Sequence, residues 1–428
     1  MVDGAVYSAG DDQVEFSIQS ISKAFVYALA IEDAGLEKVL EKIGVEPSGD
    51  AFNHLSLHTD SNRPMNPMIN AGAITAHSLV VSPTATADER TERILSKLSK
   101  LAGRQLRVDE EIYESELATA DRNMGLSYML KAAGIISCDP AEAVKGYVRQ
   151  CSILVTVRDL AMMAACLCNA GVHPVTGETI IHQNSVRQVL SVMTTCGMYD
   201  AAGDWVSNVG FPAKSGVAGG IIGSLPGQVG IATFSPNLDE QGNSTRGIVI
   251  CERLSREMGL HMMDVSQIAR ATVRTSIARL RAPHPKDDPD HAHHPDCEQK
   301  VVIFNMRGAV RFAGSERLAR AVEYEFNAPS DEEPNAGQHA DACAVVFSFR
   351  DVMSFNDVAK VIIHEVLHRL LSAGLTVIVI DPSAILHWGE DERNDCKVNH
   401  PEVVKNEEEA RDLIGGRGCS SVASPDSW

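Results

Sequence analysis

The chain has 428 residues and 44% of them are hydrophobic, which is enough to bury more than one core, so we expect two domains. With 57 acidic and 38 basic residues, its formal net charge of −19 disfavours a broad surface for nucleic acid or for an anionic membrane. It has neither an apolar run of about 18 residues nor a leader-like start, so we expect a cytoplasmic protein that acts on a small molecule.

The ten cysteines are scattered without a C-x-x-C pair, and a chain of this size does not need a disulfide framework. Cys166 and Cys168 are two residues apart in a stretch typical of a helix, so their side chains face different directions. We therefore expect buried free thiols in place of a zinc site.

The first predicted element is a helix over 17–31, where Ile21, Phe25 and Leu29 recur at four-residue spacing. The apolar pattern continues in pieces to Ile43, before a turn.

Ser20 and Lys23 stand at the start of this helix. Residues i and i+3 share a helix face, so the hydroxyl and the amine can meet. A lysine made neutral by burial can take the proton of a serine nucleophile, and free N–H groups at a helix start can stabilise an oxyanion. S-x-x-K also arises by chance, so an ordinary helix start is the alternative.

Short strands are predicted between 209 and 251. Residues 219–225 and 228–234 flank a Pro-Gly turn, which is a hairpin signal, and 247–251 is predicted as a third strand. A long helix over 259–280 is expected to close the domain.

Lys214-Ser215-Gly216 precedes these strands. S-x-x-K followed far downstream by K-[ST]-G is typical of penicillin-recognising acyl enzymes, in which a strand edge faces the serine. A strand amide near Gly216 or Val217 would then be a second oxyanion donor. The usual S-D-N element is absent, which argues against a lactamase or a penicillin-binding protein.

Residues 283–299 alternate proline with histidine and charged residues and are predicted to be a linker between the domains, not a metal site. After it, strands and helices alternate, which indicates a small α/β sandwich over 300–416 with a tail over 417–428. Asn406 is predicted to cap its last helix.

The first 282 residues resemble the serine-dependent glutaminases, which have a β-lactamase-like fold made of an antiparallel sheet and a helical subdomain. The resembling segments run in consistent order along the chain: Ile18–Lys23, Glu46–Gly49, Asn66–Ala73, Glu114–Glu116, Arg122-Asn123, Gln150–Ile153, Cys196–Asp200 and Pro212–Gly220.

The resemblance implies hydrolysis of L-glutamine to L-glutamate and ammonia through a γ-glutamyl ester, without a metal or organic cofactor. It implies Ser20 as nucleophile, Lys23 as general base and Tyr199 as proton carrier, with Tyr147 ordering the site and Lys214 as a further catalytic residue. The amides of Ser20 and Val217 would form the oxyanion hole. Three further residues would hold the α-amino and α-carboxylate groups of the substrate: Asn70, Glu116 and Asn123.

Each of these residues also has an ordinary structural interpretation. Asn70 is placed to cap a helix, Glu116 and Asn123 lie in a charged stretch, the two tyrosines suit half-buried positions, and Lys214 suits a strand edge.

Family members also carry a Tyr-Ile-Pro stretch ahead of the segment where this chain begins, and this chain has no counterpart to it. A truncated or misassigned start, a weakened enzyme or a non-catalytic scaffold are therefore the alternatives to a fully active glutaminase. The resemblance further implies a homo-oligomer, a dimer or a tetramer.

The segment 300–416 resembles a STAS domain more loosely, and we expect a regulatory module whose ligand or protein partner the sequence does not identify. Asp357 aligns with a position where many relatives have a phosphorylatable serine or threonine. A carboxylate at that helix end predicts that phosphorylation does not switch this domain there. The alternative is that Asp357 only caps its helix.

Overall fold

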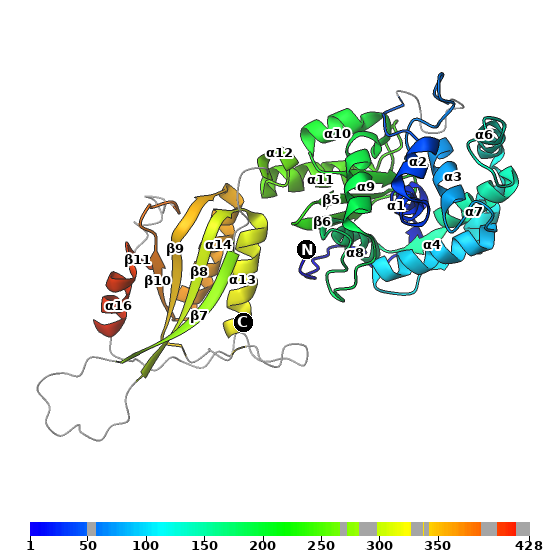
Figure 1. The fold of residues 1–428 in the computed structure, drawn as a ribbon. Coiled ribbons are helices and arrows are strands. Elements are labelled where there is room, and N and C mark those ends of the chain that lie inside the picture. The colour runs from blue at the N-terminus through cyan, green and yellow to red at the C-terminus, as the bar shows by residue number, and fades with distance from the viewer. Residues whose placement is uncertain are drawn as a thin grey trace, which may run out of the picture. The chain divides into compact units, whose positions relative to one another are not determined.

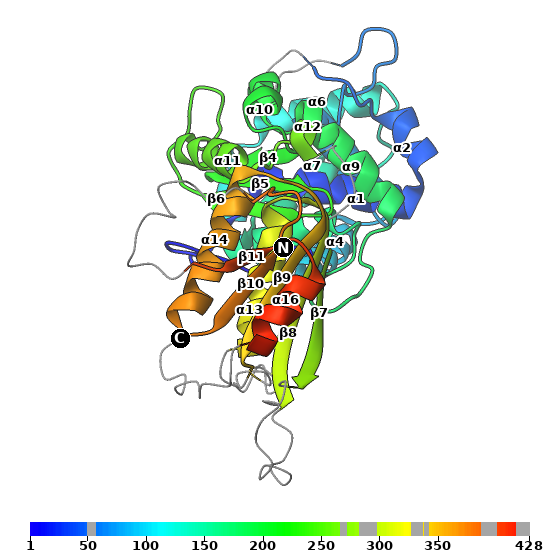
Figure 2. The same cartoon turned by 90° about the vertical axis from the view of Figure 1, so that its left-hand side faces the viewer.

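The computed structural model describes residues 1–48, 57–265, 272–281, 298–326, 337, 342–386 and 400–416. The chain divides into two compact units, one made of Met1–Arg256 with Leu260–Met263 and the other of Glu257–Gly259 with Asp264–Trp428. Figures 1 and 2 show each unit from two directions.

The first unit is largely helical. Its core surrounds α1 (Ser22–Ala34), in which every residue from Ser22 to Ile31 is buried. The other helices of this unit are α2 (Leu36–Lys42), α3 (Asn70–Leu79), α4 (Ala87–Ala102), α5 (Glu110–Ala118), α6 (Asp121–Ala132), α7 (Pro140–Cys151), α8 (Val157–Cys168), α9 (Gln183–Cys196), α10 (Ala202–Asn208) and α11 (Thr245–Met258), with α12 (Met262–Val265) at its end.

The helix predicted over 17–31 is confirmed, but it starts later, at Ser22. Ser17 belongs to β1 (Phe16–Ser17), which pairs with β3 (Ile153–Val155) in a small sheet completed by β2 (Arg107–Val108). The pairing holds the chain extended until η1, a single 3₁₀ turn over Gln19–Ile21 that leads into the helix.

A three-stranded antiparallel sheet forms the other part of the first unit, in the order β4 (Ala213–Gly216), β5 (Gly220–Leu225) and β6 (Val229–Phe234). The predicted hairpin is confirmed, since β5 and β6 pair from end to end. Helix α8 packs closely on this sheet: a Cβ at Gly230 would lie 2.2 Å from the backbone nitrogen of Ala165.

The prediction of a third strand over 247–251 is wrong, because these residues lie within α11. Gly247, Cys251 and Ser255 recur at the four-residue spacing of a helix and form its buried stripe. Val249 and Ile250 face outward and are exposed.

The second unit has a five-stranded sheet in the order β11-β10-β9-β8-β7. Strands β8 to β11 are parallel to their neighbours, and β7 is an antiparallel edge. Helices cover both faces, as the alternation predicted. The elements are β7 (Thr272–Arg281), β8 (Glu298–Val310), α13 (Phe312–Phe326), β9 (Ala344–Phe355), α14 (Asp357–Ser372), β10 (Thr376–Ile380), β11 (Glu402–Val404) and α16 (Glu407–Gly416).

Two helix starts in this unit have side-chain caps. The Glu409 N–H donates to Asn406 Oδ1 over 2.9 Å, which confirms the predicted cap of α16. At α14 the cap is Asn356, whose Oδ1 accepts from the Ala359 N–H at 2.9 Å. Asp357 is therefore the first helical residue, and the interpretation of Asp357 as the cap is wrong.

The predicted helix over 259–280 and the domain boundary at 282 are also wrong. The chain forms the short α12 and then β7, whose ten residues pair with β8 from Thr272↔Arg307 to Arg281↔Glu298. The predicted linker over 283–299 therefore falls between two paired strands of one sheet, with residues 298 and 299 already in β8, and does not separate the domains. Residues 282–297 and the tail over 417–428 lie outside the described residues.

Candidate active site

Ser20 lies in η1, where β1 gives way to α1, and its side chain is buried. The residue before it, Gln19, has a φ of +49°, which non-glycine residues rarely adopt. The Ser20 side chain lies beside the phenol of Tyr199 and partly offsets the rise that burial causes in the pKa of that phenol. The polypeptide thus presents the hydroxyl from a tight turn whose backbone is held in an uncommon conformation.

Lys23 follows in the first turn of α1 and is completely buried. Its Nζ donates to the Met68 carbonyl at 3.1 Å and to Asn70 Oδ1 at 2.7 Å. Burial lowers the pKa of Lys23 to about 8. A substantial fraction of this amine is therefore neutral near physiological pH and able to accept a proton.

Tyr199 lies in η2 (Tyr199–Ala201), with a φ of +52° and its hydroxyl 3.3 Å from the Ser215 carbonyl. Burial raises the pKa of Tyr199 to about 12, so the phenol keeps its proton at physiological pH. Lys214 Nζ stands 4.3 Å from the ring centroid and donates to the carbonyls of Gly197 and Ser215 at 3.1 and 2.7 Å. Burial, with the charge of Lys23, holds the pKa of Lys214 well below its usual value.

A hydrogen-bonded group beside Lys23 consists of Tyr147, Asn70 and Asn123, which come from α7, α3 and α6. The Tyr147 hydroxyl donates to Asn70 Oδ1 at 3.2 Å, and Asn70 Nδ2 donates to Asn123 Oδ1 at 3.0 Å. Burial raises the pKa of Tyr147 well above its ordinary value, so this phenol stays protonated. These hydrogen bonds connect Lys23 to amide and phenol side chains that are suited to binding a polar substrate.

Glu116 and Val217 lie at the outer side of this group. Glu116 is exposed near the end of α5, and its Oε1 accepts from Gln19 Nε2 at 3.3 Å. Val217 follows β4, which packs against η1: a Cβ at Gly216 would lie 3.2 Å from the Ile18 carbonyl. The structure therefore brings the predicted residues to one region of the first unit.

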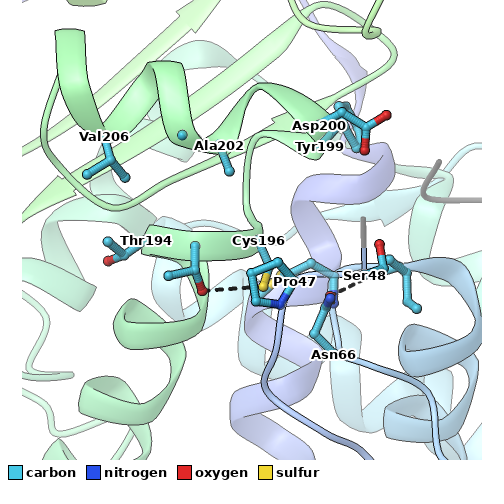
Figure 3. A pocket seen from close by; sticks show the side chains of 13 residues that line it. Pro47, Ser48, Asn66, Thr194, Cys196, Tyr199, Asp200, Ala202 and Val206 are labelled. Atoms are coloured by element: carbon cyan, nitrogen blue, oxygen red, sulfur yellow. Dashed lines mark hydrogen bonds between the residues drawn. The ribbon is translucent and has the colours of Figure 1, made fainter. Parts of the chain in front are cut away.

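A cavity of about 540 Å³ adjoins this region (Figure 3). Its lining includes Tyr199 and Met68, the residue whose carbonyl binds Lys23, but not Ser20 itself. Pro47 and Cys196 contribute apolar surface to the lining, and Ser48 and the Thr194-Thr195 pair also line it.

Sequence reasoning missed a second layer of polar residues. Gln19 links Glu116 to the nucleophile turn, and three buried side chains behind Ser20 are hydrogen-bonded to one another: Ser22, His77 and Gln150. These residues are 55 to 128 positions apart, so the only sequence signal is a polar residue inside an apolar helical stretch.

Three further findings concern the residues that the structure describes. They hold no group of three or more His, Cys, Asp or Glu side chains suited to a metal ion. None of their helices is both long enough and apolar enough to span a bilayer. The described cysteines are free thiols, and five of them are buried.

An antiparallel sheet packed with helices, with a buried serine and a buried lysine where η1 leads into the central helix, is typical of hydrolases with a β-lactamase-like fold. Comparisons with known proteins specify the family. A glutaminase family model matches residues 1–263, and the chain is 46% identical over 386 residues to a glutaminase of Corynebacterium glutamicum, covering 90% of this chain and 85% of that protein. The chain belongs to the glutaminase family and catalyses the hydrolysis of glutamine.

Other relatives agree. Glutaminase 1 of Bradyrhizobium diazoefficiens is 50% identical over 389 residues, which is 88% of this chain and 59% of that one. A crystal structure described as Mglu superposes with a TM-score of 0.61 at 42% identity and covers 90% of this chain and 88% of its own. The probable glutaminase of Bacillus subtilis has a TM-score of 0.57 at 36% identity and covers 59% of this chain and 85% of its own.

Proposed function

We propose that Ser20 is the nucleophile of this glutaminase and Lys23 its general base. The observation that carries the proposal is the buried side chain of Ser20 beside a phenol that keeps its proton, one turn before a buried lysine whose pKa is about 8. A serine hydroxyl needs a base to become a nucleophile, and a partly neutral amine at this place can act as one.

The reaction proceeds through an ester. Lys23 accepts the proton of Ser20 as the oxygen attacks the γ-carbonyl carbon, and the N–H groups of Ser20 and Val217 stabilise the oxyanion. The C–N bond then breaks, and Tyr199 donates the proton that lets ammonia leave. Water attacks the γ-glutamyl ester by the reverse proton path and releases glutamate, so one glutamine and one water give one glutamate and one ammonia.

The substrate's charged end is recognised by the outer residues. Glu116 supplies a carboxylate for the α-ammonium group, and the amides of Asn70 and Asn123 orient the α-carboxylate. Tyr147 holds Asn70 in place through the bond to Oδ1. Lys214 packs against the ring of Tyr199, since its Nζ lies 4.3 Å from the ring centroid.

Ammonia release from L-glutamine by the chain and by Ser20→Ala tests this function, with L-asparagine as the control substrate. Ser191→Ala, which removes a serine hydroxyl from the exposed side of α9, is the matched control and should keep full activity. The expected result is turnover that Ser20→Ala lowers at least a thousandfold, the scale of losing a covalent nucleophile. A folded wild-type chain that releases no ammonia would favour the non-catalytic scaffold.

The second unit is a STAS-like regulatory module in this proposal, and the protein is a cytoplasmic homo-oligomer, a dimer or a tetramer. The strand–helix alternation and the acidic residue Asp357 in the first turn of α14 support this interpretation. In this proposal phosphorylation near the start of α14 does not switch the second unit. Mass spectrometry that finds a phosphate on nearby Ser354, together with a change in activity, would contradict this. Sedimentation of the full chain tests the oligomer.

A further inference from the structure

Three buried polar side chains behind the nucleophile form one hydrogen-bonded row that the steps above do not use. Ser22 lies on α1, His77 on α3 and Gln150 on α7, and all three are completely buried. His77 Nδ1 and Gln150 Oε1 are 2.8 Å apart, and Gln150 Nε2 and Ser22 Oγ are 3.3 Å apart. Ser22 Oγ then donates to the Gln19 carbonyl at 2.7 Å.

The chemistry of the groups fixes the direction of every bond in this row. An amide oxygen only accepts, so His77 Nδ1 carries the proton that Gln150 Oε1 receives, and the amide then donates through Nε2 to Ser22. Burial lowers the pKa of His77 to about 4, so its ring is neutral at physiological pH and Nε2 is bare. This Nε2 has no hydrogen-bond partner among the described residues. All donors in the row point toward Gln19.

The packing around the row leaves space for the imidazole. Gly146 lies one turn before Gln150 on α7, and a Cβ at this position would be 2.1 Å from His77 Nε2. Only a residue without a side chain lets the ring stand in line with the Gln150 amide.

The row ends on the peptide unit that precedes the nucleophile. The carbonyl of Gln19 and the N–H of Ser20 belong to one planar group and point in opposite directions. A hydrogen bond accepted by the carbonyl therefore fixes the direction of the N–H and polarises it toward stronger donation. Because Gln19 has a φ of +49°, this plane lies away from the conformation that the free backbone prefers.

We propose that His77, Gln150 and Ser22 are positioning residues that orient and polarise the Gln19–Ser20 peptide, so that the Ser20 N–H is aimed at the developing oxyanion. None of the three touches the substrate. The inference rests on the proposed role of Ser20 and adds to it the source of the oxyanion hole's geometry.

Ser22→Ala tests the proposal, with Ser78→Ala as the matched control. Both serines are buried in helices and donate to the carbonyl three residues earlier at 2.7 Å, but Ser78 bonds to Thr75, away from the nucleophile. We expect Ser22→Ala to lower kcat about tenfold with KM within twofold, because misaiming a donor costs less than the 100-fold or greater loss from removing one. Ser78→Ala should keep kcat within twofold.

Binding of a transition-state analogue separates positioning from general loosening. The probe is the glutamine analogue in which a boronic acid replaces the γ-carboxamide, since boron becomes tetrahedral on a serine oxygen and presents a hydroxyl to the oxyanion hole. Its inhibition constant should rise in Ser22→Ala by the same factor by which kcat falls. Product inhibition by L-glutamate should stay within twofold. Ser22→Thr, which keeps the hydroxyl, should restore most of both losses.

If Ser22→Ala does not fold, Gln150→Met takes its place. Methionine is similar in size to glutamine but has no donor, so this variant breaks the row at its middle. It should lower kcat and boronate affinity by the same factor. A kcat loss no larger than that of Ser78→Ala, or a loss of kcat with boronate affinity retained, would overturn the proposal. Full activity of Ser20→Ala would instead contradict the proposed function itself, whatever the row does.

Discussion

Gln19 and Tyr199 both have positive φ angles, +49° and +52°, although neither is glycine. Each such conformation costs about 1 kcal/mol or more, so surrounding contacts must hold it. At Gln19 these contacts are the bonds of its carbonyl to the N–H and hydroxyl of Ser22, and at Tyr199 they include the bond to the Ser215 carbonyl. The two strained residues place the N–H and the phenol on which the proposed mechanism depends.

The proposed role of Lys23 as a base implies that kcat/KM depends on pH. The lowered pKa of Lys23, about 8, means that the amine loses its proton, and becomes a base, as pH rises through that value. We expect kcat/KM to rise with pH along a limb whose midpoint is near 8. Initial rates of ammonia release between pH 6 and 9 measure it, and a flat profile over this range contradicts the role of Lys23.

Lys23→Arg removes the base but keeps a cation, because a guanidinium stays protonated at these pH values. Activity should fall about a thousandfold or more, in the range of losing a general base. The control is Lys97→Arg. Lys97 lies on α4, is partly buried and donates to the Ile180 carbonyl at 2.9 Å. This variant should keep activity within twofold. Comparable losses in both variants would mean that arginine is simply not tolerated at buried lysines.

Tyr199→Phe keeps the ring beneath Lys214 and removes only the hydroxyl. We expect kcat to fall about 100-fold, because the leaving ammonia loses its proton donor. Tyr27→Phe is the matched control, since Tyr27 is buried and its hydroxyl accepts a hydrogen bond from Gln188 Nε2 at 3.5 Å, away from the nucleophile. Steady-state kinetics on both variants check this, and equal effects would remove Tyr199 from the mechanism.

The sequence predicts the residues proposed to carry out the chemistry better than it predicts the buried residues that hold them in place. Ser20 and Lys23 are three residues apart, and this spacing survives even though Ser20 lies in a 3₁₀ turn. Glu116 was assigned from the resemblance, because it stands in a charged stretch, whereas the Lys214-Ser215-Gly216 pattern had already suggested an amide near Val217. Gln150 was not predicted, since a buried amide gains its meaning only from partners that the fold brings to it.

At the scale of elements, two wrong predictions have opposite causes. Residues 247–251 are rich in β-branched side chains, but packing of one stripe against the core makes them a helix despite that preference. In 272–281 the β-branched Thr272, Val273, Thr275 and Ile277 do favour a strand, and pairing with β8 realises it. In this segment the β-branched residues already indicated a strand, and the prediction of a helix over 259–280 did not take them into account.

Close packing of α8 on the sheet gives a prediction at this scale. Gly230→Ala places a methyl group 2.2 Å from backbone that cannot move independently, so we expect a loss of about 1–3 kcal/mol in unfolding free energy. Gly203→Ala in α10, where a Cβ would have no neighbour within 4 Å, should gain up to about 1 kcal/mol from helix preference. Denaturant unfolding of both measures the difference, and equal stabilities would contradict the described packing.

At the scale of the whole molecule, each hydrophobic cluster among the described residues draws its members from one unit. The end of the first unit is held by Leu260, which is buried, and by the Met262 N–H, which donates to the Gly210 carbonyl at 2.8 Å. A chain that stops after Met263 should therefore fold and hydrolyse glutamine with kcat within threefold of the full chain. Activity assays and circular dichroism on the truncated chain check this.

A chain that stops at residue 282 is the matched comparison. It keeps β7 but loses β8, so ten residues of strand are left without their partner, and such edges recruit other chains. We expect aggregation in light scattering that the shorter chain does not show. Equal solubility of the two would contradict the assignment of 272–281 to the second unit.

The place of β7 has a consequence for synthesis on the ribosome. The first unit has all its residues once Met263 has emerged, so it can fold while the rest is still being translated. Strand β7 emerges next, but its partner begins only at Glu298, so for some seconds a nascent chain carries a strand with nothing to pair with. Its arginines at 274 and 279 place positive charge on that unpaired edge and oppose its pairing with a neighbouring nascent chain.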